Sequence, residues 1–268
     1  MSSNLINKIQ LFLNVSMFYN VRLTSKTIVL LQPQTKHLMS IIKVIIPAYN
    51  EADSIANVIN DIPNIVDEVI VVSNNSTDAT ETNAKQAGAT VLTENQKGYG
   101  YACLKGMDYV SKLETKPDII VFLDGDYSDY PEELTKIIEP IVKENIDFVI
   151  GARVKRLREQ GSMTMPQIFG NWLATTLMRI MFNSKFTDLG PFRAIKYEKL
   201  LALNMQDKTY GWTVEMQLKV LKQKLSYVEI PVNYRNRIGV SKVSGTLKGA
   251  IFAGIKILGW IFKYSFKK

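Results

Sequence analysis

Two aspartates one residue apart, Asp124 and Asp126, are the clearest candidates for chemistry in this sequence. They end the apolar run 118–123, and Gly125 between them lets both carboxylates turn toward one hard cation. Mg²⁺ or Mn²⁺ held there would bridge phosphate oxygens and neutralise charge on a departing diphosphate as a Lewis acid. The alternative is an Asp-Gly turn with solvated carboxylates. The apolar run before the pair favours the metal site.

The composition excludes several other kinds of chemistry. The single histidine, His37, lies in a poorly patterned N-terminal stretch, so a histidine-centred triad is not expected. The single cysteine, Cys103, cannot form an internal disulfide, and no Cys/His spacing for zinc is present. Acid–base chemistry must therefore come from carboxylates, and the cysteine content fits a reducing compartment.

The segment Lys97-Gly98-Tyr99-Gly100 is a second candidate for ligand contact. It is not a dinucleotide fingerprint, because Cys103 replaces the third glycine and the segment follows the third predicted strand instead of the first. Backbone amides at the start of the next helix could approach a phosphate or a sugar. A Gly-rich turn without a ligand remains the alternative.

Short apolar runs alternate with helical periods from residue 41 onward, which predicts an α/β fold with a largely parallel sheet. The predicted strands are 41–46, 68–72, 90–92, 118–123 and 148–150, and 227–230 is also strand-like. The predicted helices are 51–62, 77–87, 100–110 and 131–143.

Polar segments follow four of these strands, at 47–51, 73–78, 97–100 and 124–126. Ligands of open α/β sheets bind beyond the carboxyl ends of the strands, so these segments are expected to converge on one site. The charged segment 153–165 is long enough to move and is a candidate lid.

The chain divides into three predicted parts: 1–40, 41–243 and 244–268. The first is an N-terminal extension of unclear role, and its apolar stretch 9–18 is too short and too interrupted to span a membrane. The second is the catalytic domain. The third is an amphipathic helix that combines one Trp with several Phe and Lys residues, a composition that suits the membrane interface. A helix packed on the domain or in a dimer interface is the alternative.

Together the motifs resemble glycosyltransferase family 2, and within it the dolichyl- and polyprenyl-phosphate mannose and glucose synthases. The resemblance covers about residues 41–243 and rests on the order of VIIPAYNEADSI, VVSNNSTDAT, NQKGYGYA, FLDGDYSDYPEEL, GAR, TDLGPFRAI, YGWTVEMQ and YRNRIGVSKVSGT. It implies the A-type glycosyltransferase fold, which is Rossmann-like with a mostly parallel central sheet flanked by helices. It also implies a nucleotide-sugar donor.

The resemblance implies roles for individual residues. Asp124 and Asp126 would bind the metal. The donor-binding set would be Pro47, Tyr49, Glu51, Asn74, Lys97, Gly98, Asp124, Gly125, Asp126 and Arg153. The family often has two acidic residues, or Asp-Asn, where this chain has Ser73 and Asn74, so the choice between UDP- and GDP-sugars stays open.

The acceptor-side residues come from three later motifs. Asp188 and Glu215 resemble the acceptor-side acids of the family and are the candidate catalytic carboxylates; a turn acceptor and an exposed helix carboxylate are the alternatives. The candidate phosphate-binding residues are Arg193, Arg235, Arg237 and Lys242. The last three crowd into ten residues with the flexible Gly239, which favours an anion clamp over a solvated basic loop.

The resemblance thus implies an inverting, metal-dependent hexosyltransferase that moves a sugar from a UDP- or GDP-sugar to a lipid phosphate. The net charge of +8 fits anionic partners, and we expect a cytoplasmic protein peripheral at the inner face of the membrane, without a nucleic acid partner. A hydroxyl acceptor, on a soluble molecule or a glycan, would require Asp188 or Glu215 as the base. A sugar nucleotidyltransferase and a non-catalytic basic membrane-binding protein are further alternatives, and the oligomeric state stays open.

Overall fold

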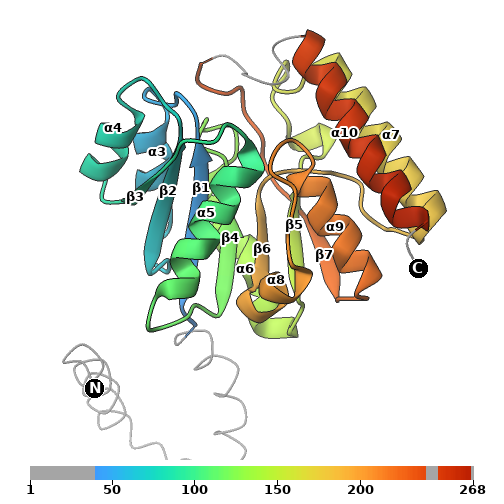
Figure 1. The fold of residues 1–268 in the computed structure, drawn as a ribbon, viewed down its shortest axis with the longest axis horizontal. Helices are drawn as coiled ribbons and strands as arrows, with labels where there is room; N and C mark the ends of the chain where they lie inside the picture. The colour runs from blue at the N-terminus through green and yellow to red at the C-terminus, as the bar shows by residue number, and fades with distance from the viewer. Residues whose placement is uncertain (1–39, 240–246, 267–268) are drawn as a thin grey trace, which may run out of the picture. The chain divides into compact units, whose positions relative to one another are not determined.

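The computed structural model describes residues 40–239 and 247–266, so Lys242 and the N-terminal extension up to residue 39 lie outside the described part. Within that part, a seven-stranded sheet has the order β3-β2-β1-β4-β6-β5-β7 (Figure 1). The strands are β1 (Ile42–Ala48), β2 (Glu68–Asn74), β3 (Thr90–Glu94), β4 (Ile119–Phe122), β5 (Phe148–Ala152), β6 (Arg193–Lys196) and β7 (Tyr227–Pro231). Neighbours are parallel except at β6, which runs antiparallel to both β4 and β5.

The central strands are apolar because helices cover both faces of the sheet. All seven residues of β1 and all four of β4 are buried. Lys43 is the charged exception on β1, and its Nζ lies 2.5 Å from Glu68 Oε2 on the neighbouring strand. The predicted α/β architecture is confirmed.

The helices form a layer on each face of the sheet (Figure 1). One buried cluster joins the sheet to α5 (Tyr99–Lys112), α7 (Met165–Phe182), α8 (Tyr197–Leu203), α9 (Trp212–Lys222) and α10 (Leu247–Phe266). The other joins it to α3 (Ile55–Asn60), α4 (Thr80–Gln86) and α6 (Leu134–Glu144). Two short 3₁₀ helices, η1 (Pro131–Glu133) and η2 (Lys155–Leu157), complete the described elements.

Helices α7 and α10 lie side by side, and α10 also contacts α9 (Figure 1). On α10, Trp260, Ile261 and Tyr264 are buried, whereas Phe252 and Phe266 are exposed. One face of the C-terminal helix therefore packs on the domain and another remains open. No helix in the described ranges combines the length and apolar character needed to cross a bilayer.

The 153–165 segment, predicted as a candidate lid, is tied down along part of its length. Arg158 forms a β-bridge with Tyr234, and Glu159 N donates to Tyr234 O at 2.8 Å. Glu159 Oε2 accepts from the backbone N of Asn236 at 2.9 Å. The segment thus shares hydrogen bonds with the chain that leads into the predicted basic clamp.

Candidate functional site

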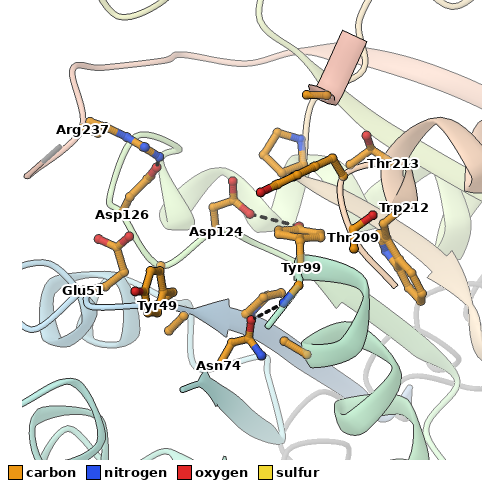
Figure 2. Close-up of a pocket in the computed structure, with 18 of the residues that line it drawn as sticks. Tyr49, Glu51, Asn74, Tyr99, Asp124, Asp126, Thr209, Trp212, Thr213 and Arg237 are labelled. Carbon is orange, nitrogen blue, oxygen red and sulfur yellow. Dashed lines mark hydrogen bonds and ion pairs between the residues drawn. The ribbon is translucent and has the colours of Figure 1, made fainter. Parts of the chain in front are cut away.

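A pocket of about 450 Å³ lies at the carboxyl ends of β1, β2 and β4 (Figure 2). The whole predicted donor-binding set lines it: Pro47, Tyr49, Glu51, Asn74, Lys97, Gly98, Asp124, Gly125, Asp126 and Arg153. From the predicted acceptor-side residues, Arg237 lines it too. The four polar segments that follow the strands therefore meet at one site, as the parallel topology requires.

Asp124 and Asp126 have different partners in this pocket. The Tyr99 hydroxyl donates to Asp124 Oδ1 at 3.0 Å (Figure 2). Asp126 Oδ1 accepts from the backbone N and the hydroxyl of Ser128 at 2.9 and 2.5 Å, while Arg237 forms an ion pair with Asp126 Oδ2. The hydrogen bonds fix one oxygen of each carboxylate.

The charge state of the pair depends on its surroundings. Burial raises the pKa of Asp124, and the positive charges of Arg237 and Arg153 oppose this rise. A divalent cation would favour the charged carboxylate in the same way, with a larger charge.

The two carboxylates suit a metal ion whose remaining ligands are substrate phosphate oxygens and water. In the described residues, no group of three or more His, Cys, Asp or Glu side chains is placed to hold a metal ion. Mg²⁺ and Mn²⁺ prefer oxygen ligands, and Mg²⁺ is commonly bound by one or two carboxylates together with substrate phosphates and water. Asp124 and Asp126 supply such a partial set.

Asn74 organises the loop before α5. Its side-chain amide donates to Gln96 O at 2.7 Å, and its Oδ1 accepts from Gly98 N at 2.8 Å (Figure 2). These bonds use the amide to join the end of β2 to the Lys97-Gly98 turn. Asn74 therefore shapes this wall of the pocket.

The same turn packs against residues 204–211, here called the 204–211 loop. A Cβ on Gly98 would overlap the carbonyl oxygen of Lys208, and one on Gly100 would overlap that of Asp207. Tyr101 N donates to Lys208 O at 3.1 Å. Only glycine permits this approach, so the two glycines have a packing role in addition to any ligand contact.

Asp188 does not line the donor pocket. Its carboxylate accepts from Arg153 Nε and Nη2 at 2.8 and 2.7 Å and from the Arg153 backbone N at 2.8 Å. Burial raises the pKa of Asp188, but the pairing with Arg153 outweighs it and holds that pKa below its usual value. The structure thus disfavours Asp188 as a base, because its oxygens orient Arg153, whose side chain reaches the pocket.

Glu215 also lies away from the pocket and is fully buried. Its carboxylate accepts from the backbone N of Gln206 and Asp207, and Lys219 Nζ lies 2.7 Å from it. The prediction of an acceptor-site acid is therefore not supported: Glu215 secures the start of the 204–211 loop.

Arg193 is the third predicted residue that the structure removes from the site. It is fully buried, and its guanidinium donates to the backbone carbonyls of Leu189, Gly190, Pro191 and Thr213. Burial lowers the pKa of this guanidinium to about 10. With its donors directed at the backbone, Arg193 holds the 189–191 turn and is not placed to bind phosphate.

The predicted basic clamp is divided between two environments. Arg237 faces Asp126 in the pocket. The Arg235 guanidinium lies between the rings of Tyr127 and Tyr130, at 3.5 and 4.0 Å from their centroids, and Nε donates to Tyr127 O at 2.8 Å. Arg235 does not line the pocket, and Lys242 lies outside the described residues.

A model of Glycosyl transferase family 2 matches residues 43–202, more than half of the chain. This chain belongs to that family. An uncharacterised glycosyltransferase of Mycobacterium tuberculosis is 32% identical to it over 215 residues, covering 79% of this chain and 94% of the relative. The undecaprenyl-phosphate mannosyltransferase of Micrococcus luteus is 29% identical over 229 residues, covering 81% of this chain and 92% of the relative.

The solved structure of M. tuberculosis glucosyl-3-phosphoglycerate synthase, in complex with Mn²⁺, uridine diphosphate and phosphoglyceric acid, is similar in fold. The TM-score is 0.70 at 20% sequence identity, covering 88% of this chain and 82% of that one. The predicted A-type glycosyltransferase fold is thus confirmed. The predicted family and the resemblance to its polyprenyl-phosphate branch are confirmed as well.

In this family 2 glycosyltransferase, the sequence prediction missed several pocket residues. The sequence prediction for the Lys97–Gly100 motif rests on its lysine and glycines and omits Tyr99, whose hydroxyl donates to Asp124 across 25 residues. Gln167, Thr209, Tyr210, Trp212 and Thr213 also line the pocket. These residues come from helices and loops that return to the site from far along the chain, so no local pattern marks them.

Asp129, three residues after Asp126, is also buried, although it does not line the pocket. Neither of its carboxylate oxygens has a hydrogen-bond partner in the structure, and only 2% of the residue is exposed. Burial, with the nearby charge of Asp124, raises its pKa to about 8. A buried acid without hydrogen bonds is costly to ionise, so Asp129 holds its proton at neutral pH.

Proposed function

We propose that this family 2 glycosyltransferase transfers a sugar, with inversion, from a nucleoside-diphosphate donor to a polyprenyl phosphate at a membrane surface. The observation that carries the proposal is that α7 and α10 contribute both to the pocket and to an exposed apolar surface. Gln167 of α7 and Ala253 of α10 line the pocket. An acceptor with a phosphate head and an apolar tail requires this combination.

The apolar surface is extensive on both helices. Its most exposed large side chains are Met165, Phe169, Trp172 and Ile180 on α7 and Phe252, Ile255, Phe262 and Phe266 on α10. Exposed apolar surface of this kind marks an interaction site, and aromatic residues favour the bilayer interface. The similar M. luteus protein is an undecaprenyl-phosphate mannosyltransferase, which supports a lipid-phosphate acceptor. We propose in addition that the enzyme lies at the inner face of the cytoplasmic membrane.

On the donor side, Asp124 and Asp126 would hold Mg²⁺ or Mn²⁺, which when bound supplies Lewis acidity at the donor diphosphate. The Mn²⁺ and UDP in the structurally similar synthase support this assignment. Arg153 and Arg237 place two further positive charges on the pocket wall. They would stabilise the negative charge that accumulates on the departing nucleoside diphosphate.

On the acceptor side, a phosphate oxygen would attack the anomeric carbon from the face opposite the leaving group. A new C–O bond forms there while the bond to the nucleoside diphosphate breaks. A lipid phosphate is already ionised, so the attack needs no general base. This agrees with the positions of Asp188 and Glu215, because both predicted bases are engaged elsewhere.

The test is a transfer assay with the full chain, UDP- and GDP-sugars, Mg²⁺ or Mn²⁺, and a short polyprenyl phosphate in detergent. We expect sugar transfer to the lipid phosphate with one of the donors, and no transfer to the matching polyprenol, which lacks the ionised oxygen. Analysis of the anomeric configuration of the product tests inversion.

Transfer to soluble hydroxyl acceptors without any lipid would contradict the proposal. Equal transfer to the polyprenol and to its phosphate would contradict the base-free attack. A nucleotide-sugar product formed from sugar phosphate and nucleoside triphosphate would support the nucleotidyltransferase alternative instead.

A further inference from the structure

A second pocket, of about 350 Å³, lies between α7 and the 152–163 segment. It shares only Arg153 and no other residue with the donor pocket. Its lining combines the cations Arg153, Lys155, Arg158 and Arg179 with the apolar side chains of Met163, Ile168 and Trp172. Asp188 is the single acidic residue among the lining residues.

The charges in this second pocket are unbalanced. The Asp188 carboxylate is paired with Arg153, which donates two side-chain hydrogen bonds to it. In the part of the chain that the structure describes, Lys155, Arg158 and Arg179 have no ion-pair partner, and Arg158 Nη1 donates to Met163 Sδ at 3.0 Å. Three positive charges therefore face one pocket without a neutralising carboxylate. Such an arrangement favours an anion with several acceptor oxygens.

The apolar part of the pocket continues onto the exposed surface of α7. Trp172 is 58% exposed, and the ring of the neighbouring Phe169, 60% exposed, lies 5.8 Å from its ring, centroid to centroid. Arg179 follows Trp172 by seven residues, which is two helical turns, so the two residues lie on the same side of α7. Basic side chains beside exposed aromatic rings are typical of protein surfaces that contact anionic headgroups at a bilayer.

We propose that the second pocket binds the phosphate of an anionic phospholipid through Lys155, Arg158 and Arg179, with the glycerol and acyl region of the lipid against Trp172. The proposal rests on the membrane location in the proposed function, but not on the identity of the sugar acceptor. The occupant is a lipid because the pocket joins cations to an exposed apolar surface, which a free phosphate would leave in water.

The experiment measures partition of the full chain onto phosphatidylcholine vesicles with and without phosphatidylglycerol, without a donor or a polyprenyl phosphate. The test variant combines Lys155→Gln, Arg158→Gln and Arg179→Gln. The control combines Lys85→Gln, Lys112→Gln and Lys143→Gln, which removes the same charge from α4, α5 and α6. Thermal unfolding checks that both variants are folded.

We expect the test variant to lose affinity for the anionic vesicles by roughly fivefold per residue, on the order of 100-fold in total. The control should lose much less, and binding to pure phosphatidylcholine should change little in either variant. Transfer to a short polyprenyl phosphate in detergent should be unchanged in the test variant.

Three results would overturn the proposal. Equal losses in the two variants would show a general charge effect. Competition by soluble glycerol phosphate at low concentration would show a site for a free phosphate. Loss of transfer in detergent with normal vesicle binding would make the pocket part of the acceptor site. If selective vesicle binding persists while transfer to polyprenyl phosphate is never found, the proposed function fails and this inference stands.

Discussion

The donor pocket and the predicted acceptor-side residues differ in how their polar side chains are used. On the donor side, Asp124 and Asp126 end a buried strand and face the pocket. The predicted acceptor-side residues Asp188, Arg193 and Glu215 are at least as polar, yet all three are buried outside the pocket. Asp188 accepts from Arg153, whereas Arg193 and Glu215 form hydrogen bonds with loop backbone. Polar side chains at the strand ends therefore face the pocket, whereas those of Asp188, Arg193 and Glu215 are used in hydrogen bonds within the protein.

The largest expected effect is on the donor side. Asp126→Asn should lower kcat by on the order of 10²–10³-fold, because one charged metal ligand is lost. Chelation with EDTA should abolish transfer, and Mn²⁺ or Mg²⁺ should restore it in the wild-type protein. Steady-state kinetics on both proteins measure this effect.

Asp53→Asn is the matched control, since Asp53 is exposed and does not line the pocket. An Asp126→Asn protein that stays active and resists EDTA would show that no metal bound by this aspartate is needed for transfer.

On the acceptor side, Glu215→Gln should mainly affect stability. The change leaves Lys219 without its buried partner and weakens the bonds to the 204–211 loop, so we expect a loss of about 3 kcal/mol in the free energy of unfolding. Activity per folded molecule should fall far less than in Asp126→Asn. Urea denaturation measures the loss, with the exposed Glu144→Gln as control. A fully stable but inactive protein would restore Glu215 as a catalytic acid.

Tyr99→Phe should have a smaller effect, on metal affinity. The lost hydrogen bond to Asp124 frees that carboxylate to rotate, and we expect roughly tenfold weaker Mn²⁺ binding by electron paramagnetic resonance. Tyr109→Phe is the control, because Tyr109 lies on the same helix and its hydroxyl donates to Glu68 at 2.8 Å, away from the pocket. Identical metal affinities in the two variants would show that Tyr99 does not position Asp124.

The last expected effect is the pH dependence of stability that Asp129 imposes. Its folded pKa of about 8 lies above the ordinary value, so the unfolded state releases this proton first as pH rises. Asp129 therefore costs stability between about pH 4 and pH 8. In metal-free buffer, Asp129→Asn should raise Tm relative to wild type more at pH 8 than at pH 4. A constant difference across this range would show that Asp129 ionises normally.

Prediction from the sequence succeeded where local pattern decides position. The strand containing Ile45 and the strand that leads into Asp124 were recognisable as apolar runs, and parallel topology then places their ends together. Strand β6 was missed, because Arg193–Lys196 is short and is fixed by antiparallel pairing with β4 and β5. Helix α7 was missed as well, since its exposed apolar residues obscure the helical period.

The acceptor-side residues could not be assigned from the sequence for a related reason. Whether Asp188 faces a ligand or Arg153 depends on a contact across 35 residues, and Arg193 is held by carbonyls up to 20 residues away. Residue type alone predicts a charge, while the fold decides whether a neighbour neutralises it.

The contact of Gly98 and Gly100 with the carbonyls of Lys208 and Asp207 has an evolutionary consequence. The Gly98–Gly100 turn contacts main-chain atoms of the 204–211 loop, so the contact does not depend on the Lys208 side chain. The Asp207 carboxylate holds the loop by accepting from Gly211 N and Trp260 Nε1 at 3.0 and 2.6 Å. The glycines themselves cannot change. Hybrid enzymes assembled from relatives should therefore be joined so that both glycines and the 204–211 backbone that they contact are kept together.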